Sequence, residues 1–347
     1  MLGLKDIIEL EKRIAPEILE MLEKRYNILR NIYYNQPVGR RALANELKMG
    51  ERVIRTEVNV LKNQDLLKVE PMGMYVTEDG KELLEDLKDF IHKLKGLSEL
   101  ERTLEKTLNI KKVIILPGNC DENELVLNDI GKNTSVYLKS RIKDNNIIGI
   151  TGGNTMAQLA EEMPYEKVAN NILVLPARGG LGKNVETQAN SIAARLAQKL
   201  GGSYRLLNIP DNIEKEALDV ILKVTEIKEI VDTIKKIDIL VFGIGRADIM
   251  AERRKLPEET IRELTTRGAV SEAFGHFFDI KGNIVWESMT VGLSLEDFKR
   301  IDEVIAAAGG DKKAEAIISI CALRKNITLV TDEGAANKIL KIANKAI

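Results

Sequence analysis

A glycine turn flanked by hydroxyl and amide side chains occupies positions 151–155, with the sequence Thr-Gly-Gly-Asn-Thr. The apolar run before it predicts a buried strand, and the segment after it predicts a helix that Asn154 or Thr155 could cap. Glycines let the backbone approach a ligand closely, and a helix N-terminus favours anions. The hydroxyls of Thr151 and Thr155 add donors. The pattern predicts a phosphate site, with an ordinary strand-to-helix turn as the alternative.

This turn lacks the lysine of a P-loop and the spacing of a dinucleotide-binding motif, so its support must come from the rest of the chain. From residue 111 onward, apolar runs alternate with helical patterns. Strands are predicted at 113–116, 147–150, 172–175, 204–207, 237–242, 304–308 and 328–331. Helices are predicted at 122–139, 155–163, 185–200, 226–236, 313–323 and 334–343. The alternation predicts an α/β fold with a doubly wound parallel sheet, whose ligands bind beyond the carboxyl ends of the strands.

Glycines, cations and hydroxyls follow five of these predicted strands. The segments are 151–155, 176–182, 243–246, 309–313 and 331–333. Arg178, either Arg253 or Arg254, and Lys313 could therefore converge on an anion. Packing would explain the glycines alone, but it does not account for the arginines and the lysine beside them.

Four side chains in this region could serve as acids or bases: Asp332, Glu333, Glu272 and His276. The sequence contains no nucleophile elbow, no cluster of metal ligands and no carboxylate pair at a telling spacing. A surface carboxylate or a satisfied core residue is the favoured interpretation of all of them except Glu272.

Composition sets outer limits on the function. A chain of 347 residues favours two domains, and a net charge of -1 means that any nucleic-acid surface must be local. We expect no signal peptide and no membrane span, because the N-terminus is charged and no apolar run approaches about 20 residues. Cys120 and Cys321 have no metal or redox spacing and predict buried free thiols in a cytoplasmic protein. His92 is expected on the solvated surface.

The first hundred residues predict a winged helix-turn-helix. A helical pattern covers 5–34, and two short helices at 40–48 and 51–63 flank the turn at Met49 and Gly50. Strand-like runs at 66–69 and 75–77 with a turn at 71–74 predict the wing. The second short helix turns Ile54, Val58 and Leu61 inward. Its other face carries groups that contact phosphates and base edges: Arg52, Arg55, Thr56, Asn59 and Asn63.

Charge in this region favours DNA as the partner. Residues 40–68 contain seven Lys or Arg against four Asp or Glu, in a chain that is slightly acidic overall. Winged helices also bind proteins, which remains the alternative. A further helix at 77–95, capped by Thr77, predicts an apolar seam from Leu83 to Leu97 that runs on through Leu104 and Leu108. The seam fits either a dimerising linker or a helix packed on one of the domains.

Several of these motifs resemble the SorC/DeoR-type bacterial transcription regulators, over essentially the whole chain. They lie at 39–43, 51–58, 151–155, 176–182, 188–190, 272–275, 308–317 and 330–336. The resemblance implies a winged helix-turn-helix at 1–85, a helical linker at 86–110 and an effector domain, related to sugar-phosphate isomerases, at 111–347. It further implies a repressor of glycolytic genes that binds double-stranded operator DNA, self-associates and responds to a phosphorylated sugar, fructose 1,6-bisphosphate in a known member.

The family's effector contacts can be carried over motif by motif. They fall on Gly152, Gly153, Asn154, Thr155, Arg178, Gln188, Arg253, Glu272 and Lys313. The family has threonine where this chain has Asn154, which can still donate and cap. DNA contacts are expected from Arg40, Arg41, Arg52, Arg55, Thr56 and Asn59. The resemblance disfavours an enzyme and implies no cofactor, metal or membrane. The alternatives are a sugar-phosphate isomerase or deaminase with an accessory DNA-binding domain, and a protein-binding adaptor.

Overall fold

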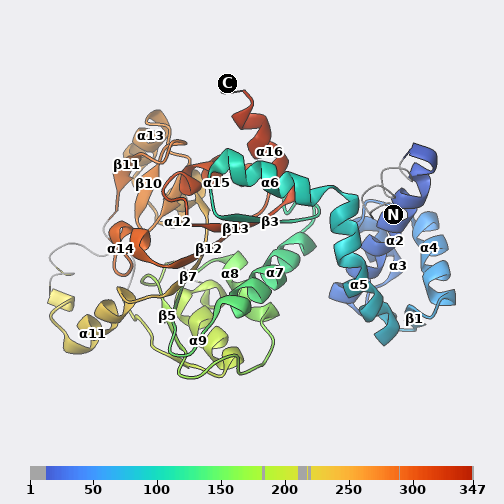
Figure 1. Ribbon diagram of the computed structural model, residues 1–347, viewed down its shortest axis with the longest axis horizontal. Helices are drawn as coiled ribbons and strands as arrows, with labels where there is room; N and C mark the ends of the chain where they lie inside the picture. The colour runs from blue at the N-terminus through green and yellow to red at the C-terminus, as the bar shows by residue number, and fades with distance from the viewer. Residues whose placement is uncertain (1–12, 182–183, 210–216, 218–219, 289, 346–347) are drawn as a thin grey trace, which may run out of the picture. The chain divides into compact units, whose positions relative to one another are not determined.

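The computed structural model describes residues 13–181, 184–209, 217, 220–288 and 290–345. The chain divides into two compact units, Met1–Glu99 and Leu100–Ile347. Figure 1 shows both units coloured along the chain.

The N-terminal unit is a winged helix-turn-helix, as predicted. Its helices are α2 (Pro16–Asn35), α3 (Arg40–Glu46), α4 (Glu51–Asn63) and α5 (Glu78–Leu94), and its wing is the antiparallel pair β1 (Leu67–Glu70) and β2 (Gly73–Val76). The first part of the helix predicted at 5–34 lies outside the described residues. Within them α2 begins at Pro16, since proline has no N–H to leave unsatisfied in a first turn. Inward residues of α2, α3 and α4, among them Ile32, Leu43 and Ile54, form one apolar core.

The predicted seam packs inside this unit. Thr77 caps α5 by accepting a hydrogen bond from the N–H of Gly80 over 3.1 Å. Leu94 is buried in the same core as α2, and Leu87 and Phe90 pack against that core. The prediction of one continuous seam through Leu104 and Leu108 is wrong, because α5 ends at Leu94 and the chain turns at Gly96 before α6 (Leu97–Leu108) begins. Within this unit α5 packs on α2, which agrees with one of the two alternatives, and a dimerising role of the seam stays a prediction.

The C-terminal unit is built on a seven-stranded sheet in which every neighbouring pair is parallel. Its order across the sheet is β3-β13-β12-β7-β4-β5-β6. The strands are β3 (Lys112–Leu116), β4 (Ile147–Ile150), β5 (Leu173–Pro176), β6 (Ser203–Tyr204), β7 (Ile239–Gly243), β12 (Glu303–Ala307) and β13 (Thr328–Asp332). Each corresponds to one predicted apolar run, which confirms the doubly wound parallel sheet. The last strand before β7 is shorter than predicted, because β6 lies at the edge and pairs only with β5.

Helices cover both faces of this sheet. Figure 1 shows α7 (Leu125–Arg141), α8 (Asn154–Glu162) and α9 (Ala189–Leu200) on one side, and α15 (Ala314–Cys321) and α16 (Glu333–Ala343) on the other. Right-handed crossovers require this arrangement, since the chain moves across the sheet in opposite directions in its two halves. The helix predicted at 185–200 is interrupted: a short turn, η1 (Val185–Thr187), precedes α9, and Gln188 between them is extended.

A small antiparallel sheet is inserted between β7 and β12, and the sequence did not predict it. Its strands are β8 (Gly245–Arg246), β9 (Ser271–Ala273), β10 (His276–Phe278) and β11 (Ile284–Glu287), in the order β11-β10-β9-β8. It carries α12 (Ala247–Arg253) and α13 (Glu258–Thr266), and its inner residues form a separate apolar cluster. The described residues of this unit also form α11 (Thr225–Ile234), α14 (Leu295–Arg300) and η2 (Asp311–Lys313).

Candidate effector site and nucleic-acid interface

A cavity of about 560 Å³ lies beyond the carboxyl ends of β4 and β7. The chain proceeds from β4 to β5 and β6 in one direction, and from β7 to β12 and β13 in the other. The order of the sheet therefore reverses between β4 and β7, and the crevice at such a reversal is where open α/β sheets bind ligands. The volume is in the range of sites for small metabolites.

All nine residues predicted to contact the effector line this one cavity: Gly152, Gly153, Asn154, Thr155, Arg178, Gln188, Arg253, Glu272 and Lys313. The structure adds residues that the sequence did not single out, among them Asn184, Thr187, Phe242 and Met250. Thr187 belongs to the segment predicted as the start of the helix at 185–200, and Asn184 directly precedes that segment. The helix is interrupted at Gln188, and Asn184 and Thr187 line the cavity just before this interruption. No feature of the sequence predicted the interruption.

One wall of the cavity is the N-terminus of α8. Gly153 occupies the capping position with φ of 113°, so the prediction that Asn154 or Thr155 caps the helix is wrong. Residues with a side chain rarely adopt that backbone conformation, whereas glycine does so freely. The N–H of Gly153 donates to the carbonyl of Thr187 over 2.9 Å and is not free. The N–H groups of Asn154, Thr155 and Met156 have no acceptor in the described part of the chain and remain available to an anion.

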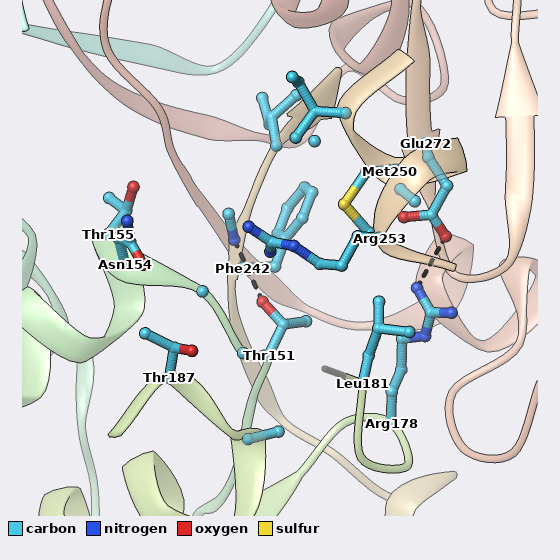
Figure 2. A pocket seen from close by; sticks show the side chains of 18 of the residues that line it. Thr151, Asn154, Thr155, Arg178, Leu181, Thr187, Phe242, Met250, Arg253 and Glu272 are labelled. Carbon is cyan, nitrogen blue, oxygen red and sulfur yellow. Dashed lines mark hydrogen bonds and ion pairs between the residues drawn. The ribbon is translucent and has the colours of Figure 1, made fainter. Parts of the chain in front are cut away.

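The opposite wall is cationic. Figure 2 shows Arg253 extending from α12 into the cavity, with Asn154, Thr155 and Thr187 across from it. The structure thus decides between the two adjacent arginines: Arg253 lines the cavity, whereas Arg254 is 4% exposed and lies outside the lining.

Lys313 also lines the cavity, at the end of η2. Burial lowers the pKa of this lysine, and the charge of Arg253 acts in the same direction, although Asp121 and Asp332 partly oppose them. A bound anion would favour the charged lysine and relieve its repulsion from Arg253. A negatively charged ligand should therefore bind this wall more tightly than a neutral one.

Glu272 lies among these cations on β9. Its Oε1 accepts hydrogen bonds from Nη1 of Arg178 and from Nη2 of Arg254, each over 2.9 Å. The N–H of Gly275 donates to the same oxygen over 2.9 Å. Burial would raise the pKa of Glu272, but the two arginines outweigh it and hold the pKa below its ordinary value. Glu272 is therefore a carboxylate, and it suits a ligand hydroxyl better than a phosphate.

The other acid–base candidates serve the fold. Asp332 is fully buried, accepts from the N–H groups of Cys120 and Gly310, and caps α16 through the N–H of Ala335. Neither this residue nor Glu333 or His276 lines the cavity. Over the described ranges, no group of three or more potential metal ligands comes together.

Cys321 agrees with expectation, whereas Cys120 and His92 depart slightly from it. Cys321 is buried and free, and burial raises the pKa of its thiol to about 12. Cys120 is free but only half-buried, because it lies on the loop after β3 rather than in a strand. His92 is half-buried as well, with its Nδ1 3.3 Å from the hydroxyl of Ser98.

The candidate nucleic-acid interface is the outer face of α4. Arg52, Arg55, Thr56 and Asn59 are all exposed. On α3, Arg41 is exposed with its Nε 3.7 Å from Glu51, while Arg40 is half-buried.

An inward carboxylate makes this outer face more basic than the sequence count suggests. Glu57 of α4 points to the opposite side, where it is 8% exposed. It binds Arg25 of α2 over 2.8 Å and lies 3.8 Å from Lys24. Glu57 lies close to Arg52 and Arg55 in the sequence, but its negative charge is on the opposite face of α4. It therefore does not reduce the positive charge of the exposed face.

Comparisons with known proteins identify the domain that contains each of these candidate sites. Residues 92–341 match the Sugar-bind family model, described as "Putative sugar-binding domain". Residues 21–91 match the model of the CggR N-terminal DNA binding domain. The Central glycolytic genes regulator of Bacillus subtilis is 40% identical over 338 residues, which cover 97% of this chain and 99% of that protein.

The chain belongs to the SorC/DeoR family of sugar-binding transcriptional regulators. A crystal structure of a SorC family regulator from Enterococcus faecalis, 38% identical, covers 70% of this chain and 99% of its own with a TM-score of 0.66. The full-length Sorbitol Operon Regulator SorC of Klebsiella pneumoniae covers 93% of this chain and 98% of its own at a TM-score of 0.66, and at 19% identity it supports the fold alone.

Membership of this family confirms the resemblance read from the motifs. The relatives are named as transcriptional regulators, so the protein is a sugar-binding regulator with a DNA-binding domain and not an enzyme. Of the helices that the structure describes, none is long and apolar enough to cross a membrane.

Proposed function

We propose that this regulator represses genes of sugar metabolism in the cytoplasm and that a phosphorylated sugar, most simply fructose 1,6-bisphosphate, releases it from its operator. One observation carries the proposal: two different donor sets face each other across a single cavity. The amides at the N-terminus of α8 can bind a phosphate without a formal charge. Arg253 and Lys313 provide charge for a second phosphate.

The sugar between the two phosphates would lie beside Glu272. A carboxylate accepts hydrogen bonds and repels phosphate, so Glu272 would recognise a hydroxyl of the ligand. The name of the Bacillus subtilis relative, a regulator of central glycolytic genes, supports a glycolytic bisphosphate over other phosphosugars. Asn154, in place of the family's threonine, keeps a donor at the same wall.

The DNA partner would meet α4 in the major groove. Arg52, Arg55, Thr56 and Asn59 would reach base edges, with Arg40 and Arg41 near phosphates. A single winged helix covers one half-site, so we propose that two copies of the chain bind a two-fold operator.

Thermal unfolding with a panel of phosphosugars tests the effector. A ligand that binds only the folded protein adds roughly 2.7 kcal/mol at about a hundred times its dissociation constant. We expect fructose 1,6-bisphosphate to raise the melting temperature most, followed by monophosphates, with no effect of unphosphorylated fructose. The same sugar should reduce the binding of operator DNA in a gel-shift titration, which requires that it favour one conformation over another. Equal shifts by phosphorylated and plain sugars would contradict the proposal.

A further inference from the structure

A buried cluster of three charged side chains lies behind the effector cavity. Glu272 stands between Arg178 and Arg254, with both ion pairs at 2.9 Å. The side chains are 3%, 11% and 1% exposed respectively. Arg254 is thus the most deeply buried of the three, and it is the one that does not line the cavity.

The geometry of the carboxylate is asymmetric. Both guanidinium groups and the N–H of Gly275 donate to Oε1. In Figure 2 the other carboxylate oxygen points away from Arg178, to the side where Arg253 extends into the cavity. Three donors on one oxygen fix the rotation of the carboxylate, so Oε2 is the oxygen offered to a ligand.

The charges of the cluster do not cancel. One carboxylate lies between two guanidinium groups, which are always protonated. If Arg178 alone faced Glu272, the pair would be neutral and would give an anion little attraction. With Arg254 present, the cluster keeps one positive charge next to the cavity.

From these contacts we propose that Arg254 is a positioning residue of the effector site. It holds the Glu272 carboxylate with one oxygen toward the cavity, and its positive charge gives the three side chains together a net charge of +1 beside the cavity. The second half of this inference rests on the proposed phosphosugar function. The first half concerns the free protein and does not.

Other titratable groups near Glu272 are engaged elsewhere or face the ligand. Arg246 on β8 pairs with Asp248, and His276 on β10 lies 3.0 Å from the carbonyl of Phe274. Glu315 on α15, the helix packed against β9, is exposed. Arg253 and Lys313 line the cavity itself. Arg178 and Arg254 are therefore the charges that decide whether Glu272 is ionised.

The sign of the pH effect follows from this arrangement. A carboxyl group with a lowered folded-state pKa stabilises the fold above its unfolded-state pKa, and that contribution is lost as pH falls through the folded value. Removing Arg254 raises the pKa of Glu272, so the loss should begin at a higher pH. The shift should be absent when position 272 cannot ionise.

The first experiment measures thermal unfolding against pH without ligand, for wild type, Arg254→Met, Arg254→Lys, Glu272→Gln and the double variant Arg254→Met/Glu272→Gln. Arg254→Met should lose stability at a higher pH than wild type, and Arg254→Lys, which keeps the charge, should lie close to wild type. Glu272→Gln and the double variant should share one pH profile. The positioning role is overturned if the pH dependence of unfolding differs between Glu272→Gln and the double variant. It is also overturned if Arg254→Met has the pH dependence of wild type. If Arg254→Met does not fold, the comparison of Arg254→Lys with wild type, and of the double variant with Glu272→Gln, still decides.

The second experiment measures the affinity of the same variants for fructose 1,6-bisphosphate by calorimetry. Loss of the charge should weaken binding roughly tenfold in Arg254→Met, and less at high salt. The weakening should persist in the double variant relative to Glu272→Gln, because the charge is lost there too. Unchanged affinity in both comparisons overturns the charge role. If wild type binds no phosphosugar, the proposed function fails and the charge role fails with it, while the ligand-free pH profiles still decide the positioning role.

Discussion

The N–H of Gly243 donates a hydrogen bond to the hydroxyl oxygen of Thr151 over 3.2 Å. The two residues are 92 positions apart: Gly243 ends β7 and Thr151 directly follows β4, and the sheet order reverses between these two strands. The bond therefore ties together the two strand ends that open onto the effector cavity. It also shows why a hydroxyl at the first position of the Thr-Gly-Gly-Asn-Thr turn has a structural task in addition to any contact with a ligand.

The variant Thr151→Val tests the hydrogen bond to Gly243 separately from the volume of the side chain. Valine has nearly the same volume but cannot accept the hydrogen bond, so the N–H of Gly243 loses its partner at a cost of about 1–3 kcal/mol. We expect a lower melting temperature and weaker binding of fructose 1,6-bisphosphate. Thr151→Ser keeps the hydroxyl and is the matched control. Equal stability of the valine variant and wild type would mean that water replaces the bond.

The fold of the C-terminal unit was predictable because its strands are short continuous apolar runs bounded by turn residues. The inserted sheet was not, since strands as short as Gly245–Arg246 and Ser271–Ala273 are too brief to show a period of two. The outer face of α4 was predictable for the opposite reason: thirteen residues of helix show a full amphipathic period.

The cationic wall could be predicted only in part. Arg253 and Arg254 are adjacent at the end of a helix, where successive side chains point about 100° apart. Which of them faces the cavity depends on how α12 packs on the inserted sheet, so the pattern of residues left both open and only the family resemblance pointed to Arg253. Glu272 was identified by resemblance, yet its pairing with Arg254 joins two segments of the insertion that the sequence left unassigned.

Lys313→Met should stabilise the free protein while weakening the effector site. The lowered pKa of Lys313 means that its charged form is disfavoured in the folded state, so the ionised lysine costs stability at neutral pH. Removing it should raise the free energy of unfolding, within the range of about 0.5–2 kcal/mol that is common for single stabilising substitutions. The neighbouring Lys312 is exposed, and Lys312→Met is the control. A lower melting temperature for the Lys313 variant would contradict this assignment.

The same lysine predicts how effector binding depends on pH. A bound anion favours the charged form of Lys313. The affinity for the effector should therefore fall as pH rises through the pKa that Lys313 has in the ligand-free protein. An ordinary lysine has a pKa of about 10.4. Because the pKa of Lys313 is lowered, the affinity should begin to fall at a lower pH than that. Calorimetric titration of fructose 1,6-bisphosphate at increasing pH measures it. In Lys313→Met the fall should be absent over the same range.

Two arginines of the N-terminal unit should affect DNA binding differently. Arg55→Ala should reduce discrimination between operator and altered operator, by about 1–3 kcal/mol if the side chain reads a base. Arg41→Ala should weaken binding to all sequences and flatten the dependence on salt, because a phosphate contact releases counterions without reading sequence. Lys81 on α5 pairs with Glu78, and Lys81→Ala is the control. Wild-type binding by both arginine variants would remove α3 and α4 from the interface.

Arg253→Ala tests whether the cavity recognises two phosphates. Fructose 1,6-bisphosphate should bind wild type more tightly than fructose 6-phosphate does, since a monophosphate leaves one donor set unpaired. Hydrogen bonds to charged groups contribute about 1.5–3 kcal/mol, so losing Arg253 should weaken the bisphosphate by about tenfold or more. The monophosphate should lose less if it occupies the amides of α8, and the gap between the two ligands should narrow. Arg267, exposed at the end of α13 and paired with Glu263, lies outside the cavity lining and provides the control variant Arg267→Ala. Equal affinities of the two sugars in wild type would leave a sensor of one phosphate group, and an unchanged gap in Arg253→Ala would assign the second phosphate to Lys313 and Arg178.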